Sequence, residues 1–546
     1  MSEVDSYTTV RAPLKNGEVV VSPNRRLPML VSANKRLLQN DFRVGRSNAS
    51  SIREESRAEL LKLAAKYTRQ YAPNITIPTS PETIFVSGHQ PEFFHPGVWF
   101  KNFLLYGLAK KHNGISINLV IDNDECKSTS IPVPAGSLDN PKTVDVPFDP
   151  PGKALPFENR YWSETQTAKN FQVRVQETFS VGHSSDLLLD QIWPRILPEI
   201  EPSPGKKEAS LKKTLGQSVA QARHQVEIAN EIGNLEVPLS QICRGKGFQL
   251  FLSAILQSAD HFHATYNAAI QKFRTENKIR SKTRPVPELV RNEQWIELPF
   301  WIWTGDSPER GPLYIRCESV EEDRCQIFLS DLDSIKLQLR SDALVDELSK
   351  LANDESNDGI TIRPRALITT MFARLFLSDV FIHGIGGAKY DELTDEIIRE
   401  FFKINPPQFL TATSTNWLPI EFTPPNTDEI ASAKQQVREA IFHPEKSENE
   451  SDEFVELANR KSKLLSDIPR KRNRKQWHSE ISSVNQQLSE LNSVERKKAD
   501  SELNRLIDRL RISKILCSRE YSILLHPVSL IQTLSEQVDK VLMNAD

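Results

Sequence analysis

The chain has 546 residues, of which 38% are hydrophobic and 26% are charged, and its formal net charge is −3. This length exceeds what a single hydrophobic core supports, so we expect a globular protein of several structural units. The nearly balanced charge excludes a general attraction to nucleic acid or to anionic lipid. Because no run of about 18 apolar residues occurs and the N-terminus lacks an apolar signal core, we expect no membrane span and a cytoplasmic location.

The cysteines form neither a zinc-binding pattern nor a disulfide framework, because they are odd in number and widely scattered. They are Cys126, Cys243, Cys317, Cys325 and Cys517. The sequence therefore predicts no metal site, and the one cofactor worth considering is a nucleotide.

Shifts in pattern divide the chain into six predicted segments of an α/β protein. They are an N-terminal extension and helix (1–80), the first part of the core (81–150), an inserted α+β region (151–350), the second part of the core (351–425), a helical coiled-coil arm (426–515) and a C-terminal segment that returns to the core (516–546). We expect residues 1–50 to be irregular, and the apolar positions of residues 51–71 predict a helix.

Residues 84–124 carry the pattern of one strand–helix–strand unit. A buried strand is predicted over 83–86 and a second over 117–121, with apolar helical spacing between them. Pro96 suits the first turn of that helix, since the first N–H of a helix has no intrahelical partner. Such a unit predicts two parallel strands joined by a helix.

Polar residues follow both of these strands. They are Gly88, His89 and Gln90 after the first strand, Asp122, Asn123 and Asp124 after the second, and His95 and Gly97 at the start of the helix. Ligands bind beyond the carboxyl ends of strands in open parallel sheets, so we expect these residues to share one rim. The free N–H groups of the helix start would favour an anion. In the alternative interpretation, His89 satisfies a loop carbonyl, His95 packs beside Phe94, and Asp124 caps a turn.

A second informative stretch lies at residues 361–402. It predicts a helix over 366–377, a strand over 379–382, and a glycine-rich turn with Gly386 and Gly387 that leads into another helix. Such a turn lets backbone N–H groups approach a phosphate or carboxylate. The spacing is neither a P-loop nor a dinucleotide fingerprint. A tight helix entry that requires positive φ is the alternative.

Three motifs together resemble the cysteine-adding ligases of bacillithiol synthesis. Ser87-Gly88-His89-Gln90 is similar to that family's Thr-Gly-Gln-Gln turn, and Asp122-Asn123-Asp124-Glu125 to its Glu-Asp-His-Asp segment. Ile385-Gly386-Gly387, with Tyr390 soon after it, is similar to its Ile-Gly-Gly turn. His89 replaces a glutamine of the family motif, and the acidic segment lacks the family's histidine. The resemblance covers residues 50–125 and 360–546.

The resemblance implies a Rossmann-like parallel-sheet core with an inserted middle region and a C-terminal antiparallel coiled-coil arm. It also implies a ligase-like reaction. We expect His89 and His95 to stabilise negative charge, and Asp122 or Asp124 to orient an amine or hydroxyl or to act as a general base. Gly88, Gln90, Gly97, Asn123, Gly386, Gly387 and Tyr390 are the expected ligand-binding residues.

The middle of the chain adds fewer candidates. Residues 258–274 predict a helix in which His261 and His263 lie on different faces, so they are no metal-ligand pair. Residues 293–317 predict two strands around a turn, from which Arg310 and Arg316 could reach a ligand carboxylate.

The last third of the chain predicts a helical arm. Trp477, Ile481, Val484, Leu488 and Leu491 recur at alternating spacings of four and three, and Leu503, Leu506 and Leu510 continue on a returning helix. We expect an antiparallel pair over 452–514 that mediates self-association into a homo-oligomer. The basic run 470–475 is expected to be a solvated hairpin end rather than a nucleic-acid contact. Residues 519–531 are expected to return as a core strand or docking segment.

Three hypotheses for function follow. The first is a cytoplasmic ligase-like or group-transfer enzyme acting on a small anionic metabolite, with or without a nucleotide. The second is a non-catalytic scaffold whose arm drives assembly. The third is a nucleotidyltransferase of the HIGH type, because His95-Pro96-Gly97-Val98 matches part of that motif. Polar residues at two separate strand ends favour the enzyme, since a scaffold has no need of them.

Overall fold

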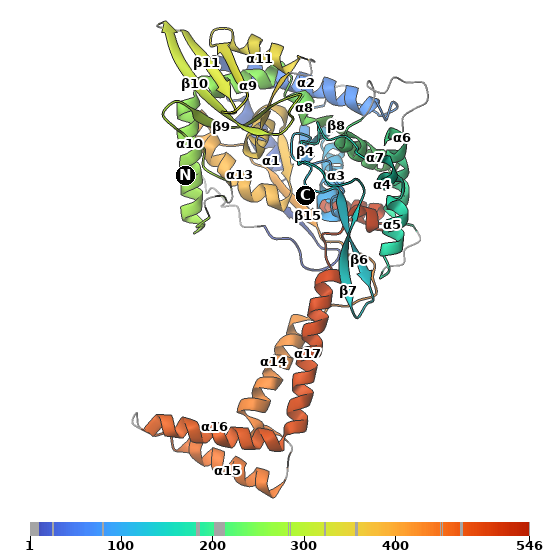
Figure 1. The fold of residues 1–546 in the computed structure, drawn as a ribbon, viewed down its shortest axis with the longest axis vertical. Helices are drawn as coiled ribbons and strands as arrows, with labels where there is room; N and C mark the ends of the chain where they lie inside the picture. The colour runs from blue at the N-terminus through green and yellow to red at the C-terminus, as the bar shows by residue number, and fades with distance from the viewer. Residues whose placement is uncertain are drawn as a thin grey trace.

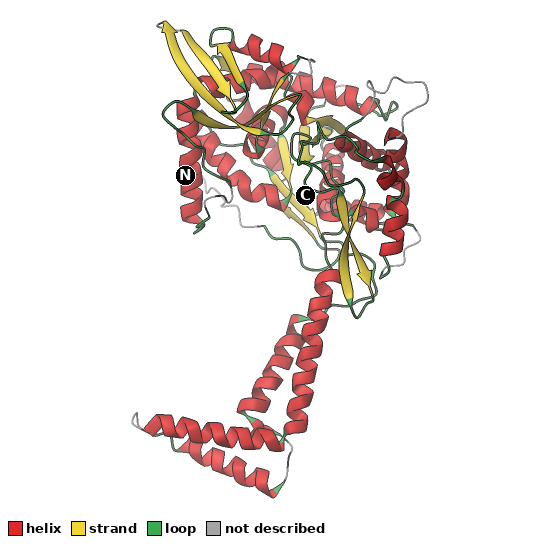
Figure 2. Cartoon of the chain, in the orientation of Figure 1, coloured by secondary structure: helices red, strands yellow, loops and turns green. Residues whose placement is uncertain are grey.

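The computed structural model describes residues 10–23, 27–78, 81–181, 186–200, 213–281, 283, 286–321, 324–354, 359–447, 449, 451–469 and 473–544. These residues form a head, in which helices surround two main sheets, and a helical arm that protrudes from it (Figure 1). Figure 2 shows that the strands are confined to the head, while the described part of the arm consists of helices and the turns that join them. None of the described helices combines the length and hydrophobicity that a membrane crossing requires.

A six-stranded sheet forms the centre of the head. Its strands, in spatial order, are β1 (Val19–Ser22), β15 (Leu410–Ser414), β14 (Val380–His383), β4 (Ile84–His89), β5 (Ile115–Val120) and β8 (Leu235–Pro238). All neighbours are parallel except β1, which pairs antiparallel with β15. Helix α3 (Pro96–Lys111) connects β4 to β5, so the predicted parallel strand–helix–strand unit is confirmed.

The order in which the chain adds strands to this sheet reverses between β4 and β14. The strand that follows β4 in the chain, β5, lies on one side of it, and β14 lies on the other. Helix α3 follows β4 onto one face of the sheet, whereas α13 (Ile385–Ile397) follows β14 and packs in the core on the opposite face. Adjacent strands whose helices leave toward opposite faces have an open crevice at their carboxyl ends.

Each face of the sheet has its own hydrophobic core. Along β4, Ile84 and Val86 belong to one core and Phe85 to the other, while along β14 Phe381 alternates with Val380 and Ile382. This explains why these strands are apolar throughout, because a parallel sheet is covered on both sides.

Different helices cover the two faces. The first core contains α2 (Ala49–Arg69), α9 (Lys246–Gln257), α10 (Ala259–Glu276) and a second sheet, and the other contains α3, α6 (Leu188–Ile200), α7 (Leu215–Ala229) and α18 (Leu530–Met543). The helices predicted over 51–71 and 258–274 are α2 and α10, and both predictions are confirmed.

The second sheet has five antiparallel strands. In spatial order they are β12 (Lys336–Arg340), β11 (Arg324–Ser330), β10 (Gly311–Glu321), β9 (Ile296–Thr304) and β13 (Ile360–Pro364). The hairpin predicted within 293–317 is β9 and β10, and this prediction is confirmed.

Shorter elements complete the head. The small ladders are β2 (Arg43–Val44) with β3 (Ser47–Asn48) and β6 (Ser130–Gly136) with β7 (Pro141–Pro147). The remaining helices are α1 (Leu27–Gln39), α4 (Thr165–Lys169), α5 (Phe171–Thr178), α8 (Leu239–Ile242), α11 (Leu344–Ala352) and α12 (Ala366–Phe372), the last of which continues as a π-helical turn, Ala373–Leu377.

Two sequence-based assignments are wrong, and a third is right in one of its alternatives. Residues 1–50 are not uniformly irregular, because they contain α1 and the edge strand β1. The region 151–350 is not a separate insertion, since β8 lies inside it and pairs with β5 of the central sheet. Of the two alternatives for residues 519–531, the strand is wrong and the docking segment is confirmed, since they make a 3-10 turn and the start of α18, which docks against α3.

The arm consists of two stacked helix pairs rather than one. Helix α14 (Thr427–Phe442) packs on α17 (Ser493–Leu516), and α15 (Asp452–Ser466) packs on α16 (Arg474–Leu491) at the far end (Figure 1). The predicted pairing of 477–491 with 503–510 is therefore wrong. The apolar stripe of α16 faces its sequence neighbour α15, with which it buries Phe454 and Leu488. Of the basic run 470–475, residues 470–472 lie outside the described residues.

A buried ionic network fixes α7 against the central sheet. Arg223 on α7 bonds to both Glu227 and Glu236, and all three side chains are almost fully buried. Asn102 of α3 donates to Glu227 over 2.9 Å, and Asn118 of β5 donates to Glu236 over 2.7 Å. Two carboxylates thus depend on one guanidinium in a region without solvent.

We predict that Arg223→Met destabilises the head by about 3–5 kcal/mol, because it leaves buried negative charge uncompensated. The triple variant that adds Glu227→Gln and Glu236→Gln removes that charge and should recover most of the loss. Calorimetric melting of the three proteins tests this. A single variant that melts like the parent protein would contradict the structural importance of the network.

Candidate functional site

A cavity of about 570 Å³ opens at the carboxyl ends of the central strands. This volume lies within the range of small-molecule binding sites. Nine of the predicted site residues line it, namely Gly88, His89, Gln90, His95, Gly97, Asn123, Asp124, Gly386 and Gly387. The cavity lies where α3 and α13 leave β4 and β14 in opposite directions, so the two stretches singled out in the sequence meet at one rim.

Two predicted site residues lie outside this cavity. Asp122 is 4% exposed and accepts hydrogen bonds from the backbone N–H and hydroxyl of Ser240, so it fixes the start of α8. Burial raises the pKa of Asp122 to about 7, and nearby Glu158 acts in the same direction. Tyr390 lies further along α13 and is 37% exposed, but it does not line the cavity. Neither residue is part of the cavity lining.

Asp124 forms an ion pair with Arg310 at the wall of the cavity. Its carboxylate accepts from Gln90 Nε2 over 2.8 Å and from Arg310 Nη1 over 3.1 Å. Arg310, from the five-stranded sheet, also donates to the backbone oxygen of Asn123 and lies over the ring of Trp301. Asp124 is therefore a positioned, ion-paired carboxylate that joins the two sheets across the site.

The start of α3 is not free to bind an anion, contrary to expectation. His95 is the N-cap residue of α3, and its Nδ1 accepts from Gly97 N over 3.1 Å. The carbonyl of His95 accepts from Val98 N, and Pro96 has no N–H to offer. The helix start is thus satisfied internally, and Gly97 allows the close packing that a side chain would prevent by colliding with Arg519 and the end of β15.

The two predicted histidines are uncharged near neutral pH. Burial, together with Lys101, lowers the pKa of His89 to about 3, and burial with Arg519 lowers the pKa of His95 to about 3. His89 Nδ1 lies 3.1 Å from the Gln90 carbonyl, which can only accept, so the proton is on Nδ1 and Nε2 is an acceptor. His95 uses Nδ1 as an acceptor and therefore carries its proton on Nε2.

The start of α13, in contrast, has unused hydrogen-bond donors. Its N-cap is Gly384, which has no side chain to supply an acceptor, and its first turn holds no acidic residue. In the described part of the chain, the N–H groups of Ile385, Gly386 and Gly387 have no acceptor, and the first satisfied N–H is that of Ala388. A Cβ on Gly386 would meet only open space, whereas one on Gly387 would lie 2.8 Å from His383 Nδ1.

Lys101 is the one cationic residue of the cavity that lacks an acidic or hydroxyl partner in the described chain. It is 3% exposed, and its ammonium donates to the backbone oxygen of Gly88 over 2.9 Å. No carboxylate of the described residues pairs with it, whereas Arg310 pairs with Asp124 and Arg519 donates to Thr413 and Thr415. Burial lowers the pKa of Lys101 to about 8.

A buried histidine–aspartate pair supports the wall formed by β14 and α13. His383 Nε2 lies 2.9 Å from Asp391, which also accepts from Arg374 and from the Thr370 hydroxyl. Burial lowers the pKa of His383 despite the opposing effect of Asp391. Burial opposes ionisation of Asp391, but Arg374 and His383 outweigh it and hold its pKa below the usual range.

The base of the arm supplies the last part of the wall. Arg519 and Glu520 follow α17 directly and line the cavity. Arg519 Nη2 donates to the Thr413 hydroxyl over 2.7 Å, and Glu520 lies 3.4 Å from His95 Nε2.

Sequence reasoning missed Lys101, His383, Trp301 and Arg519. A signal existed for Lys101, which is the single charged residue between Pro96 and Ala109 in an otherwise mostly apolar helix. His383 ends a short apolar strand directly before the glycine-rich turn, which is also readable in the sequence. Trp301 and Arg519 reach the site from elements that only the tertiary structure brings near.

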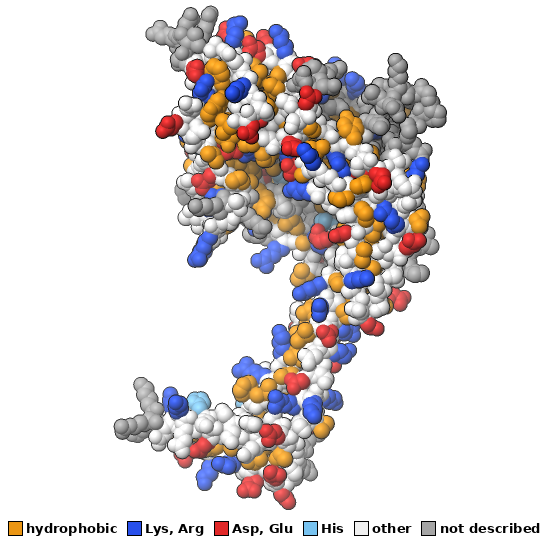
Figure 3. All heavy atoms as spheres, in the orientation of Figure 1, with side chains coloured by type: hydrophobic (Ala, Val, Ile, Leu, Met, Phe, Trp, Pro, Cys, Tyr) orange, Lys and Arg blue, Asp and Glu red, His pale blue; other side chains and the backbone are white. Residues whose placement is uncertain are grey.

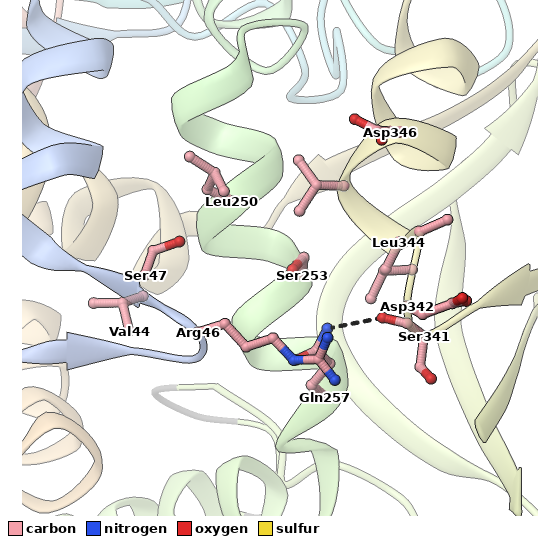
Figure 4. A pocket seen from close by; sticks show the side chains of 12 residues that line it. Val44, Arg46, Ser47, Leu250, Ser253, Gln257, Ser341, Asp342, Leu344 and Asp346 are labelled. Atoms are coloured by element: carbon pink, nitrogen blue, oxygen red, sulfur yellow. Dashed lines mark hydrogen bonds between the residues drawn. The ribbon is translucent and has the colours of Figure 1, made fainter. Parts of the chain in front are cut away.

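A much smaller pocket lies elsewhere in the head. A pocket of about 110 Å³ lies between the β2–β3 turn, α9 and the start of α11, and Figure 4 shows Arg46, Ser253 and Asp342 around it. The side chain of His263 is buried, and its Nε2 lies 3.1 Å from the backbone oxygen of Leu289. Within the described ranges, no group of three or more His, Cys, Asp and Glu side chains is placed to hold a metal ion.

No protein-family model matches the chain, and no protein of curated function has significant sequence similarity to it. The site must therefore be interpreted from its own geometry.

We predict that His89 and His95 make the folded protein less stable as the pH falls below 6.5. The unfolded chain protonates both imidazoles near pH 6.5, whereas the folded chain does not until about pH 3. Each contributes a loss of about 1.4 kcal/mol per pH unit in that window. Melting temperatures from pH 7 to pH 5 should fall less steeply for the double variant His89→Gln, His95→Gln. Asp122 acts in the opposite direction but is present in both proteins.

Parallel curves for the two proteins would show that the imidazoles are protonated equally in the folded and unfolded states. That outcome would remove the assignment of both as neutral hydrogen-bonding groups.

Proposed function

We propose that the protein is a ligase-like or group-transfer enzyme that acts on a small anionic metabolite in the cavity at the ends of β4 and β14. The observation that carries this proposal is the buried ammonium of Lys101, which no carboxylate of the described chain neutralises. A buried charge is unfavourable unless it is paired, so a ligand that brings negative charge stabilises this site.

The arrangement of polar groups supports group transfer rather than simple storage. Lys101 and the start of α13 offer positive charge and N–H donors, while Asp124 and the acceptor Nε2 of His89 lie on the same cavity. One ligand end can therefore be held as an anion while an amine or hydroxyl is oriented by hydrogen-bond acceptors. Asp124 is an orienting group here, since its two oxygens already accept hydrogen bonds from Gln90 and Arg310, which fix its position.

A Rossmann-like classification of the core is part of this proposal. In chain order, the parallel strands β4, β5, β8, β14 and β15 occupy positions that read 3-2-1-4-5 across the sheet. That order is the dinucleotide-fold order, and its ligand crevice lies between the first and fourth strands. It supports the resemblance to the cysteine-adding ligases, and it makes a nucleotide the cofactor that we propose to test first.

The two other hypotheses have weaker support. A HIGH-type nucleotidyltransferase would steady a triphosphate with its histidines, but His95 is held neutral and caps its own helix. In a pure scaffold no ligand would compensate the buried ammonium of Lys101, and such a charge opposes folding when it stays unpaired.

A thermal-shift screen with nucleotides, amino acids and small carboxylic acids tests the proposed function. A true ligand at a hundredfold excess over its Kd stabilises the folded state by about 2.7 kcal/mol. We expect Asp124→Asn to reduce the shift for at least one ligand class, because it removes the negative charge and one of the two oxygens that accept from Gln90 and Arg310. Asp145→Asn, on the exposed side of β7, is the matched control and should leave the shift unchanged.

Ligands found in this way are then incubated together, and mass spectrometry detects a covalently joined or group-transferred product. Two results would contradict an enzyme site in this cavity. In the first, the parent protein binds no compound of the panel; in the second, the parent protein and the Asp124→Asn variant bind every compound equally well.

We further propose that the arm mediates self-association through the face of α17 that carries Ile507 and Leu510. These side chains are three residues apart on one helix face and are 45% and 39% exposed. They adjoin Leu506, which is buried against the partner helix α14. Figure 3 shows further apolar side chains along the arm, interspersed with charges of both signs. A second copy laid along this face would extend the arm as a coiled coil.

We predict that Ile507→Asp with Leu510→Asp shifts the sedimentation of the protein to that of a monomer while its melting temperature stays the same. Leu488 is unsuitable for this test, because it is fully buried between α15 and α16 and its loss would unfold the arm. Val173→Asp, at an exposed apolar position of the head, serves as control. A parent protein that already sediments as a monomer would refute the self-association.

A further inference from the structure

We propose that the start of α13 and Lys101 together form a phosphoryl-binding subsite, so that the anionic metabolite, or the nucleotide used with it, is held by a phosphate group. This inference deepens the proposed function and rests on it, since it concerns one end of the same cavity. It names the ligand chemistry, which the cavity alone leaves open.

The backbone donors come from the first turn of α13. The N–H groups of residues 385–387 have no acceptor in the described chain, and the N-cap Gly384 provides no side chain to occupy them. A thirteen-residue helix with an open N-terminus carries partial positive charge there. Gly386 leaves this end accessible, because a Cβ at that position would meet nothing within 4 Å.

The second, independent observation is the ammonium of Lys101. Its methylenes Cδ and Cε lie 3.9 Å from the ideal Cβ position of Gly384, so the side chain runs past the turn that starts α13. The Nζ atom donates to Gly88 over 2.9 Å, which leaves further N–H donors of the ammonium for a ligand. Lys101 is 3% exposed and has no carboxylate partner among the described residues. A buried cation and an open helix start therefore face the same end of the cavity.

The chemistry of these donors favours a phosphate over a carboxylate. A lysine ammonium binds phosphate as a point charge, in combination with backbone N–H groups at the start of a helix. The two arginines of this cavity are already engaged, Arg310 with Asp124 and Arg519 with Thr413. Several backbone N–H groups and one ammonium approaching from different sides fit the tetrahedral oxygens of a phosphoryl group.

The acids near this end of the cavity do not oppose an anion. Asp391 is the nearest carboxylate on α13, and it is bonded to Arg374, His383 and Thr370. Its charge is therefore compensated within the wall. The first turn of α13 contains no acid of its own.

Isothermal titration of inorganic phosphate, pyrophosphate and ADP into the full-length protein at constant ionic strength tests the subsite, with succinate and malate as carboxylate probes. Lys101→Met removes the charge but keeps an apolar side chain of similar length. Gly386→Asp places a carboxylate in open space at the helix start, where a Cβ meets no atom. The matched controls are Lys110→Met, an exposed lysine on the same helix, and Gly386→Ser, which adds no charge.

We expect the phosphate-bearing probes to bind the parent protein and both controls. Their affinity should fall by about 10- to 100-fold in Lys101→Met and in Gly386→Asp, as for the loss of a charged hydrogen bond. Melting temperatures of all variants establish that they are folded. The carboxylate probes should bind more weakly than phosphate or pyrophosphate.

Several results would overturn the subsite. Phosphate binding that survives both Lys101→Met and Gly386→Asp would place it elsewhere on the protein. Binding of succinate or malate that depends on Lys101, without binding of any phosphate probe, would replace the phosphoryl group by a carboxylate and leave the proposed function intact. Binding of neither class would overturn the subsite, and the proposed function then stands or falls with the Asp124→Asn comparison.

Discussion

The parallel pairing of β4 with β14 is the constraint on which the site depends. These strands are neighbours in the sheet, but nearly three hundred residues separate them along the chain, and their helices leave toward opposite faces. The crevice between them cannot be closed by either connection, since each turns away from it. Everything else at the cavity, including the hairpin that carries Trp301 and the base of the arm, is placed around this opening.

The electrostatic character of the cavity is set by what burial does to each basic group. The imidazoles of His89 and His95 lose their charge, because nearby cations and the loss of solvent both disfavour protonation. The guanidinium of Arg310 is bonded to Asp124. Lys101 remains as a concentrated positive charge beside unoccupied N–H groups, so the attraction for an anion is local to one end of the cavity rather than spread around its wall.

Much of the site could be predicted from the sequence, because short-range pattern determines where a strand ends and a helix begins. The apolar run Ile84, Phe85 and Val86 and the placement of Pro96 identified the first unit, and with it the positions of His89 and Asp124. The charge states of the histidines could not be predicted in this way. They depend on Lys101 and Arg519, which approach through tertiary packing. Asp122 was misassigned because, in the sequence, β8 looks like part of an insertion. In the structure β8 pairs with β5, and Asp122 accepts a hydrogen bond from the turn that follows β8.

The junction between the arm and the head forms part of the cavity wall. The last long helix of the arm ends at Leu516. Three residues later, Arg519 donates hydrogen bonds to the hydroxyls of Thr413 and Thr415 at the end of β15. The chain then continues into the buried core through Tyr521 and Ile523. The arm is joined to the head by two stretches of chain, residues 415–426 before α14 and residues 517–520 after α17. The second stretch carries Arg519 and Glu520, which line the cavity, so the residues that connect the arm to the head also form part of the cavity wall.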